Sequence, residues 1–224
     1  MSEQYITLPG GVVVTMRSPV AHNRFWLKGQ YYEANMLAHI RESYHGGTFI
    51  DCGACIGNHT LYFAAFCAEQ VIAIEPVQRN MDYLRENLRL SDLRAKVTTV
   101  LLALGSKSGM GAMTHPEGKD YVGVDRYFLV DGNETGITTL DEITKLAQYP
   151  VTLVKLDIEG SELKALQGAT RLLQEQAPVL FVEVQRARKS ELELITRFLK
   201  SFGYVRGKRF NSTPTYKFYT SRKV

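Results

Sequence analysis

Cysteine is scarce in this chain of 224 residues: there are three, an odd number that leaves no complete set of disulfides. No N-terminal stretch joins a basic region to a long apolar one, which is the pattern of a secretory signal. The longest apolar runs, such as 12–14 and 179–182, fall far short of the roughly 20 residues that a membrane-spanning helix needs. We therefore expect a cytoplasmic protein that does not associate with a membrane.

The overall composition is that of a globular protein. Hydrophobic residues make up 45% and charged residues 22%, which is enough for one sizeable core, and we expect a single domain over 1–224. The formal net charge of +4 is unevenly spread, because residues 183–224 hold 11 Lys or Arg against 3 Glu, a net charge of +8. Such a segment either attracts a phosphate-bearing partner or forms the solvated face of a terminal helix.

From residue 48 onward, short apolar runs alternate with segments of helical periodicity. The expected strands are 48–51, 71–74, 97–102, 151–156 and 179–184, and the expected helices are 58–67, 78–90, 161–174 and 189–202. This alternation predicts an α/β fold with a mostly parallel sheet. Two last strands, 204–210 and 215–220, are separated by only 211–214, too short for a parallel crossover, so they predict an antiparallel hairpin.

Two regions lie outside this alternation. The N-terminal extension, residues 1–47, predicts a strand pair with a turn at Pro9 and then an amphipathic helix from Tyr32 to Tyr44. Residues 105–138 contain seven glycines and form an irregular insert, which is either a small β-insertion or a mobile lid. Because long loops in compact domains are commonly functional, we expect the insert to contribute to a binding site.

The most informative stretch is FIDCGACIGNHT, 49–60, where an apolar strand runs into a glycine-rich turn and then a helix. Nucleotide-like ligands bind at this place in open α/β sheets. The turn lacks the G-x-G-x-x-G of a dinucleotide site, the chain lacks the P-loop string, and Asp51 would repel a pyrophosphate. Asp51 would instead attract a ligand with a positively charged amine and a sulfonium, while Gly53 and Gly57 would let the backbone approach it closely. S-adenosylmethionine is such a ligand.

A second acid strengthens this interpretation. The next strand ends at Glu75, which lies 22 residues after Gly53, where an acidic side chain is placed to accept hydrogen bonds from both ribose hydroxyls. The simpler alternative stays open: Asp51 caps a helix, Gly57 is needed only for packing, and Glu75 is a solvated strand end.

With these residues in view, the chain resembles the FkbM-type family of S-adenosylmethionine-dependent methyltransferases. The matching segments are 49–64, 73–88, 138–143, 154–169 and 178–184. The resemblance implies a class I methyltransferase fold, Rossmann-like, with strand order 3-2-1-4-5-7-6. It also implies methyl transfer to a hydroxyl of a sugar or another small metabolite. We expect the 105–138 insert to form part of the site for this acceptor.

The resemblance also assigns cofactor contacts. Ala103 and Leu104 would flank the adenine. The family's turn usually reads D-x-G-A-N-x-G, but Cys55 stands at the Asn position, so the contact to the methionine carboxylate is either missing or taken over by a neighbouring polar residue. The neighbours that we expect near this end of the cofactor are Asn58, His59 and Thr60.

The segment LVKLDIEGSE, 153–162, places carboxylates where an acceptor would meet the methyl group. Asp157 would lie beside the sulfonium, and a group that takes the hydroxyl proton would add roughly 10²–10⁴-fold to the rate. The candidate proton acceptors are Asp157, Glu183 and His59, and the candidate acceptor contacts are Glu159, Glu162 and His115. A divalent cation held by carboxylates is an alternative, but we expect no metal, and Cys52 with Cys55 make only an incomplete metal site.

Two other functions compete with this one. Aromatic and basic residues interleave over 204–219, which would suit an RNA methyltransferase that stacks bases and tracks phosphates, although strand packing gives the same pattern. Cys55 also leaves open a protein that keeps the fold without chemistry, but the presence of both Asp51 and Glu75 argues against that reading.

Overall fold

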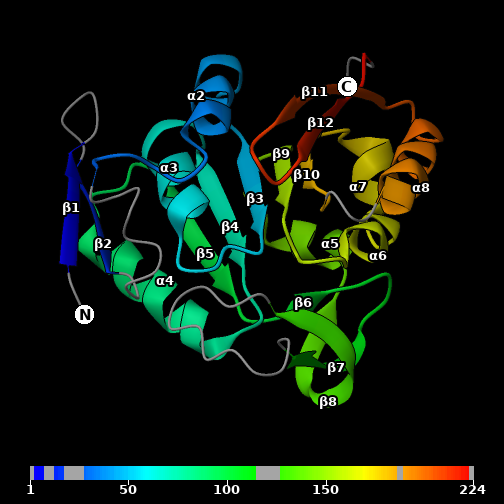
Figure 1. The fold of residues 1–224 in the computed structure, drawn as a ribbon, viewed down its shortest axis with the longest axis horizontal. Coiled ribbons are helices and arrows are strands. Elements are labelled where there is room, and N and C mark those ends of the chain that lie inside the picture. Colours follow the sequence, from blue (N-terminus) through cyan, green and yellow to red (C-terminus); the bar gives the residue numbers. More distant parts are fainter. Residues whose placement is uncertain (1–2, 8–12, 18–27, 115–126, 186–188, 222–224) are drawn as a thin grey trace.

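The computed structural model describes residues 3–7, 13–17, 28–114, 127–185 and 189–221. At its centre lies a seven-stranded sheet in the order β11-β12-β10-β9-β3-β4-β5 (Figure 1). The parallel strands are β3 (Thr48–Cys52), β4 (Gln70–Ile74), β5 (Lys96–Val100), β9 (Val151–Leu156) and β10 (Val179–Glu183). The antiparallel strands are β11 (Val205–Phe210) and β12 (Thr215–Tyr219). Counted along the chain from the β5 edge, the order is 3-2-1-4-5-7-6. The predicted α/β fold with a mostly parallel sheet and an antiparallel C-terminal hairpin is confirmed.

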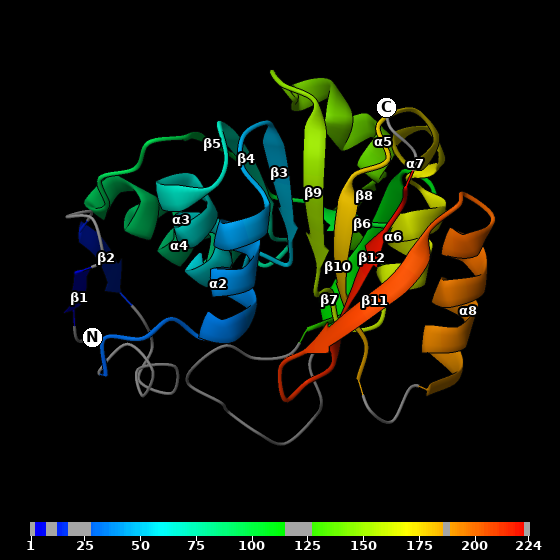
Figure 2. The ribbon, with the colours of Figure 1, turned by 90° about the horizontal axis from the view of Figure 1, so that it is seen from above.

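Helices cover both faces of this sheet (Figure 2). On one face lie α2 (Ala34–Ser43), α3 (Asn58–Phe66) and α4 (Gln78–Leu90), and on the other lie α5 (Leu140–Ile143), the 3₁₀ helix η2 (Thr144–Leu146), α6 (Glu162–Gln167), α7 (Thr170–Glu175) and α8 (Lys189–Lys200). Because successive strand residues point to opposite faces, Phe49 packs with α2 and α3 whereas Ile50 packs with α5 to α8. None of the helices in the described ranges is long and apolar enough to cross a membrane.

The helix expected over 161–174 is in fact two helices, α6 and α7, so that prediction was wrong. The amide of Gly168 donates to the carbonyls of Lys164 and Ala165, which closes α6. A new helix then begins, because the carboxylate of Asp141 accepts hydrogen bonds from the amides of Arg171 (3.1 Å) and Leu172 (2.9 Å). A distant capping group of this kind leaves no mark in the local sequence pattern.

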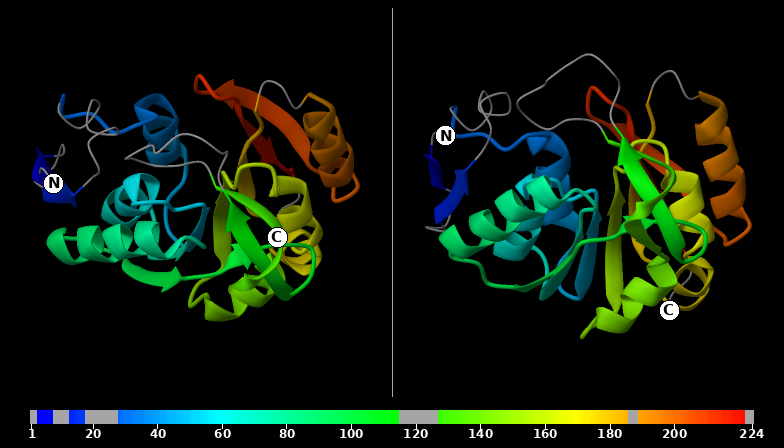
Figure 3. Two further views of the ribbon diagram at one scale, coloured as in Figure 1. Left: turned by 60° about the horizontal axis from the view of Figure 1, so that its bottom comes forward. Right: turned by 90° about the horizontal axis from the view of Figure 1, so that it is seen from below.

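The N-terminal strand pair and helix are also present. β1 (Glu3–Thr7) and β2 (Val13–Arg17) pair antiparallel. β2 lies against α4, where the amide of Arg17 donates to Asn87 Oδ1 (2.7 Å) and Asn87 Nδ2 donates back to the Arg17 carbonyl (3.2 Å). The strand pair and α8 lie at opposite ends of the molecule (Figure 3).

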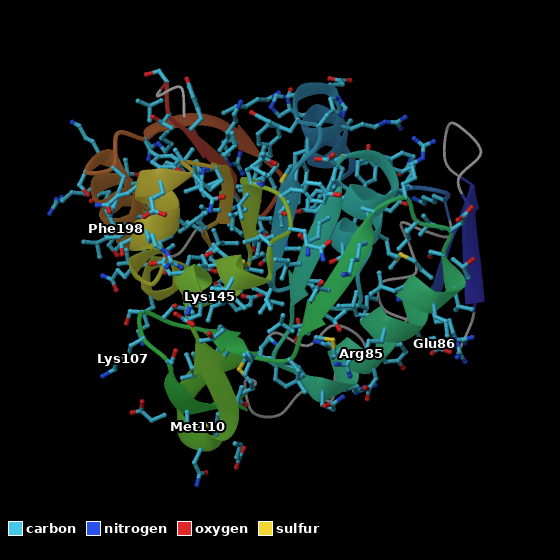
Figure 4. The ribbon with its side chains drawn as sticks, turned by 180° about the vertical axis from the view of Figure 1, so that it is seen from behind. Arg85, Glu86, Lys107, Met110, Lys145 and Phe198 are labelled. Atoms are coloured by element: carbon cyan, nitrogen blue, oxygen red, sulfur yellow. The ribbon has the colours of Figure 1, made fainter. Side chains whose placement is uncertain are left out.

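The described part of the 105–138 insert is a β-insertion. β6 (Ala103–Leu104), β7 (Gly109–Thr114) and β8 (Phe128–Thr138) form a three-stranded sheet. The β7–β8 hairpin projects from the body of the protein with Met110 at its outer end (Figure 4). His115, a predicted acceptor contact, lies outside the described residues.

Candidate active site

A cavity with about 700 Å³ of empty space lies at the carboxyl ends of β3, β4 and β9. Six of the predicted cofactor residues line it: Gly53, Cys55, Glu75, Ala103, Leu104 and Asp157. The β-insertion closes one side through Met113, Tyr127 and Leu129, which the sequence analysis had not singled out.

Gly53 fixes the shape of this cavity. Its backbone lies in the left-handed region (φ 78°), and its amide donates to the carbonyl of Ile74 (3.0 Å). A Cβ atom at this position would lie 1.9 Å from the carbonyl oxygen of Asp157. Only glycine allows the end of β9 to approach the turn so closely, and this approach brings Asp157 to the cavity wall.

Glu75 is held rigidly at the opposite wall. Its Oε2 accepts from the amide of Cys55 (2.9 Å), and its Oε1 accepts from the amide of Val77 (3.0 Å) and from Asn80 Nδ2 (3.2 Å). Burial raises the pKa of Glu75, although these hydrogen bonds oppose the shift. A carboxylate has about four acceptor positions, so one position remains at Oε2. Glu75 is therefore a buried, oriented acceptor in the cavity and not a solvated strand end.

Cys55 lies in the same turn with a left-handed backbone (φ 50°). Residues other than glycine rarely adopt this conformation, and asparagine adopts it more readily than most. The Asn that the family usually has here would therefore suit the backbone better than the thiol does.

We expect Cys55→Asn to raise the free energy of unfolding by about 0.5–1 kcal/mol, because it relieves a strained left-handed backbone. Urea denaturation of the wild type and the variant measures this change. Cys55→Ala is the matched control, since it removes the thiol without the left-handed preference. An equal gain from alanine would show that the thiol and not the backbone is responsible.

Asp51 does not line the cavity in this structure, so its contact with the cofactor amine stays a prediction. It is fully buried, where its Oδ2 accepts from the Thr60 hydroxyl (2.6 Å) and its Oδ1 lies 3.4 Å from Lys155 Nζ. Thr60 is therefore hydrogen-bonded to Asp51, and it does not line the cavity either. The register explains the pairing, because Asp51 and Lys155 are direct neighbours across β3 and β9.

Gly57 and Asn58 also lie away from the cavity wall. Gly57 precedes α3 with φ 104°, and a Cβ there would lie 2.8 Å from a methyl carbon of Leu84. Asn58 forms two hydrogen bonds with the backbone of Tyr32, accepting from its amide (3.1 Å) and donating to its carbonyl (3.1 Å). These residues thus fix α3 and the N-terminal extension in place, so for Gly57 the packing interpretation fits the geometry.

Lys155 is the centre of a buried charged group that we call the Lys155 cluster: Lys155, Asp51, Asp157, Glu33 and Glu183. Its side chain is only 2% exposed, and Nζ lies 3.4 Å from both Asp51 Oδ1 and Asp157 Oδ2. Burial alone would lower the pKa of Lys155, but the carboxylates of Asp157, Asp51 and Glu33 raise it well above its usual value. Lys155 is therefore a permanent cation and not a base.

Glu183 is the cluster member at which burial and neighbouring charges act together on the pKa. Burial, followed by the negative charges of Asp157 and Glu33, raises the pKa of Glu183 to about 9. This shift favours the protonated form of Glu183 at neutral pH, in which it would be a poor proton acceptor. Asp157, whose side chain is 25% exposed, is the carboxylate of this pair that lines the cavity.

We accordingly expect Glu183→Gln to keep methyl transfer within about threefold of wild type at pH 7, whereas loss of a proton acceptor costs roughly 10²–10⁴-fold. The folded pKa lies above the unfolded value of 4.5, so the neutral carboxyl loses its stabilising effect as the pH rises toward 9. As the pH rises from 5 to about 9, the free energy of unfolding of the wild type should therefore fall relative to that of Glu183→Gln. Urea denaturation at several pH values measures this difference. A large loss of activity at pH 7 would contradict the protonated state.

His59 is paired with Glu33, a residue that the sequence analysis missed. His59 Nε2 lies 3.0 Å from Glu33 Oε2, and the two side chains are 8% and 3% exposed. Glu33 comes just before α2 in a left-handed conformation (φ 60°). It belongs to the N-terminal extension, outside every matching motif, so no signal in the sequence linked it to His59.

The two acids after β9 have separate roles. The carboxylate of Glu162 accepts from the amides of Ile158 (3.0 Å) and Gly160 (3.2 Å), and burial raises its pKa to about 7. Glu162 thus stabilises its own turn, away from the cavity. Glu159 lines the cavity, and its carboxylate accepts from the side chain of Gln185. Within the described ranges, no group of three or more His, Cys, Asp or Glu side chains is arranged to hold a metal ion.

The aromatic and basic residues near the C-terminus mostly contact one another or the core. Phe210 and Phe218 are buried. The guanidinium of Arg206 lies over Tyr216 (5.7 Å), and Lys217 Nζ lies over Tyr219 (5.1 Å). Strand packing therefore accounts for much of the interleaved pattern.

Comparisons with known proteins agree with this architecture. The sequence profile of the family described as the methyltransferase FkbM domain matches residues 51–206. Among solved structures, a methyltransferase FkbM from Methylobacillus flagellatus KT superposes with a TM-score of 0.59 at 24% identity, covering 78% of this chain and 44% of that one. M. jannaschii TYW2, solved in complex with AdoMet, superposes with a TM-score of 0.50 at 15% identity over 98% of this chain and 88% of that one.

The fold is thus that of the class I methyltransferases, which the sequence predicted. The chain belongs to the FkbM methyltransferase family. A curated relative, the hexuronic acid methyltransferase AglP of Haloferax volcanii, is 31% identical over 153 residues, which is 66% of this chain and 59% of the relative. The chain therefore spans less than two thirds of that relative's length.

Proposed function

We propose that this methyltransferase moves the methyl group of S-adenosylmethionine to a hydroxyl oxygen of a sugar or another small hydroxylated metabolite. The observation that carries the proposal is the cavity between Glu75 and Asp157, because it offers an acceptor for ribose at one wall and a carboxylate at the other. The relative named for hexuronic acid methylation supports a sugar as the acceptor.

The residues present fit the cofactor. Glu75 Oε2 keeps one acceptor position for a ribose hydroxyl, and Ala103 and Leu104 supply an apolar surface for adenine. Gly53 has no side chain, so the backbone of the turn lies directly beside Asp157. When bound, S-adenosylmethionine supplies an electrophilic methyl group on a positively charged sulfur.

Asp157 is the residue that we assign to the acceptor's proton. Its Oδ2 forms an ion pair with Lys155 (3.4 Å), which holds the carboxylate in one orientation at the cavity wall. As the new C–O bond forms and the bond from sulfur to the methyl group breaks, leaving an uncharged thioether, the hydroxyl proton would pass to this carboxylate and then to solvent. Much of the remaining acceleration comes from holding the two reactants in line.

A wide groove that is lined in part by Glu33 of the Lys155 cluster is a second hollow in which an acceptor could lie. It runs between α2 and the β11–β12 turn and is lined by residues that include Tyr32, Glu33, Tyr62 and Asn211. Burial and the charges of Glu33, Glu183 and Asp157 raise the pKa of Tyr32 to about 12, so its hydroxyl stays protonated beside the cluster.

The test is to incubate the protein with methyl-labelled S-adenosylmethionine and two pools from the source organism, a fractionated sugar and glycan pool and total RNA. We expect label in alkali-stable methyl ethers of the first pool. Label confined to RNA, or no transfer to either pool, would contradict the proposal.

A further inference from the structure

The Lys155 cluster has more carboxylates than cations. It holds the ammonium of Lys155 against the carboxylates of Asp51, Asp157 and Glu33, while burial and the nearby charges favour the protonated form of Glu183. A protonated His59 beside Glu33 would still leave one carboxylate in excess among the described residues. The cluster is therefore negative in either state of His59.

Glu33 makes this excess unusual for a buried site. Its side chain is 3% exposed, and its Oε1 is buried with no hydrogen-bond partner among the described residues. Buried charges are ordinarily paired and fully hydrogen-bonded, because an unsatisfied one is costly. Glu33 also acts electrostatically on both Lys155 and Glu183, so it belongs to the same buried group.

The N-terminal extension holds Glu33 in this place. The carbonyl of Glu33 accepts from the amides of Met36 (3.0 Å) and Leu37 (3.2 Å) at the start of α2. The preceding residue, Tyr32, is fixed through its backbone to Asn58. The charge is thus delivered by a segment that precedes the matched family domain, which begins at residue 51.

We propose that this uncompensated charge, to which Glu33 contributes, makes the site bind a positively charged sulfonium cofactor more tightly than its uncharged thioether product. The inference rests on the proposed function. A sulfonium near Asp157 supplies the missing positive charge, whereas S-adenosylhomocysteine has none. Once the proton taken by Asp157 has left, the negative cluster favours exchange of the product for a new cofactor molecule.

Calorimetry on the protein without added acceptor tests this directly. We expect S-adenosylmethionine to bind at least about tenfold more tightly than S-adenosylhomocysteine at pH 7.5, because unit charges a few ångströms apart interact strongly inside a protein. Sinefungin, which carries an ammonium group in place of the methyl sulfonium, should bind like S-adenosylmethionine. Equal affinity for the charged and uncharged ligands would overturn the inference while leaving the proposed function intact.

Variants assign the effect to the cluster. The quantity compared is the affinity for S-adenosylmethionine divided by the affinity for S-adenosylhomocysteine. Glu33→Gln should lower this ratio by about threefold or more, and Asp157→Asn should bring it close to one. Glu42→Gln is the matched control, because Glu42 is an exposed acid on α2 and should leave the ratio unchanged. An unchanged ratio in both Glu33→Gln and Asp157→Asn would overturn the inference. Failure of all three ligands to bind the wild type would instead refute the proposed function, and the inference with it.

Discussion

Asp157→Asn is expected to lower the rate of methyl transfer by about 10²–10⁴-fold, which is the usual contribution of a positioned proton acceptor. The amide keeps the shape of the side chain and stays at the cavity wall, but it cannot take the hydroxyl proton. Single-turnover rates at saturating S-adenosylmethionine measure the chemical step and remove any effect on cofactor affinity.

Asp131→Asn is the matched control for this variant. Asp131 lies exposed on β8, so the same change of charge there should leave the rate as it is in the wild type. Transfer by Asp157→Asn within about threefold of wild type would remove Asp157 from the mechanism. His59, which is paired with Glu33, would then be the next candidate for the proton acceptor.

The second large effect concerns stability. Lys155→Met should lower the free energy of unfolding by about 3–5 kcal/mol, because removal of one partner leaves a buried charge without its counter-ion. Asp51 is the group most affected, since it is fully buried and its Oδ1 has no hydrogen-bond partner in the described structure apart from its ion pair with Lys155. Urea denaturation at pH 7 measures the change.

Two further variants make this prediction specific. Lys155→Met combined with Asp51→Asn should recover part of the lost stability, because the uncompensated charge is then absent. Lys145→Met removes an exposed lysine (Figure 4). Lys145 Nζ lies 2.6 Å from Glu142, and we expect the change to cost no more than about 1 kcal/mol. Equal losses in the free energy of unfolding from Lys145→Met and Lys155→Met would show that the buried ion pair stabilises the fold no more than the exposed one.

The fold was largely predictable because its signals are local. The strands and the glycine turn can be identified from apolar runs and breakers, and α4 begins and ends at the expected residues, 78 and 90. The break between α6 and α7 was not predictable, since the carboxylate that caps α7 comes from Asp141, 30 residues before Arg171. Long-range caps of this kind are set by packing and not by the neighbouring sequence.

The candidate site was predictable only in part. Gly53, Glu75 and Asp157 lie where the turn and the strand ends predict, at the wall of one cavity. Asp51 pairs with Lys155 across β3 and β9, a partner that its type and place in the sequence did not indicate, and its contact with the cofactor stays a prediction. Glu33 was missed altogether, because only the folding of the N-terminal extension onto α3 brings it to His59.

A crystal structure of the protein with S-adenosylmethionine tests the central claim most directly. We predict that the ribose donates to Glu75 Oε2, that adenine lies against Ala103 and Leu104, and that the sulfonium lies beside Asp157. A cofactor bound elsewhere, or one whose ribose is turned away from Glu75, would contradict the account.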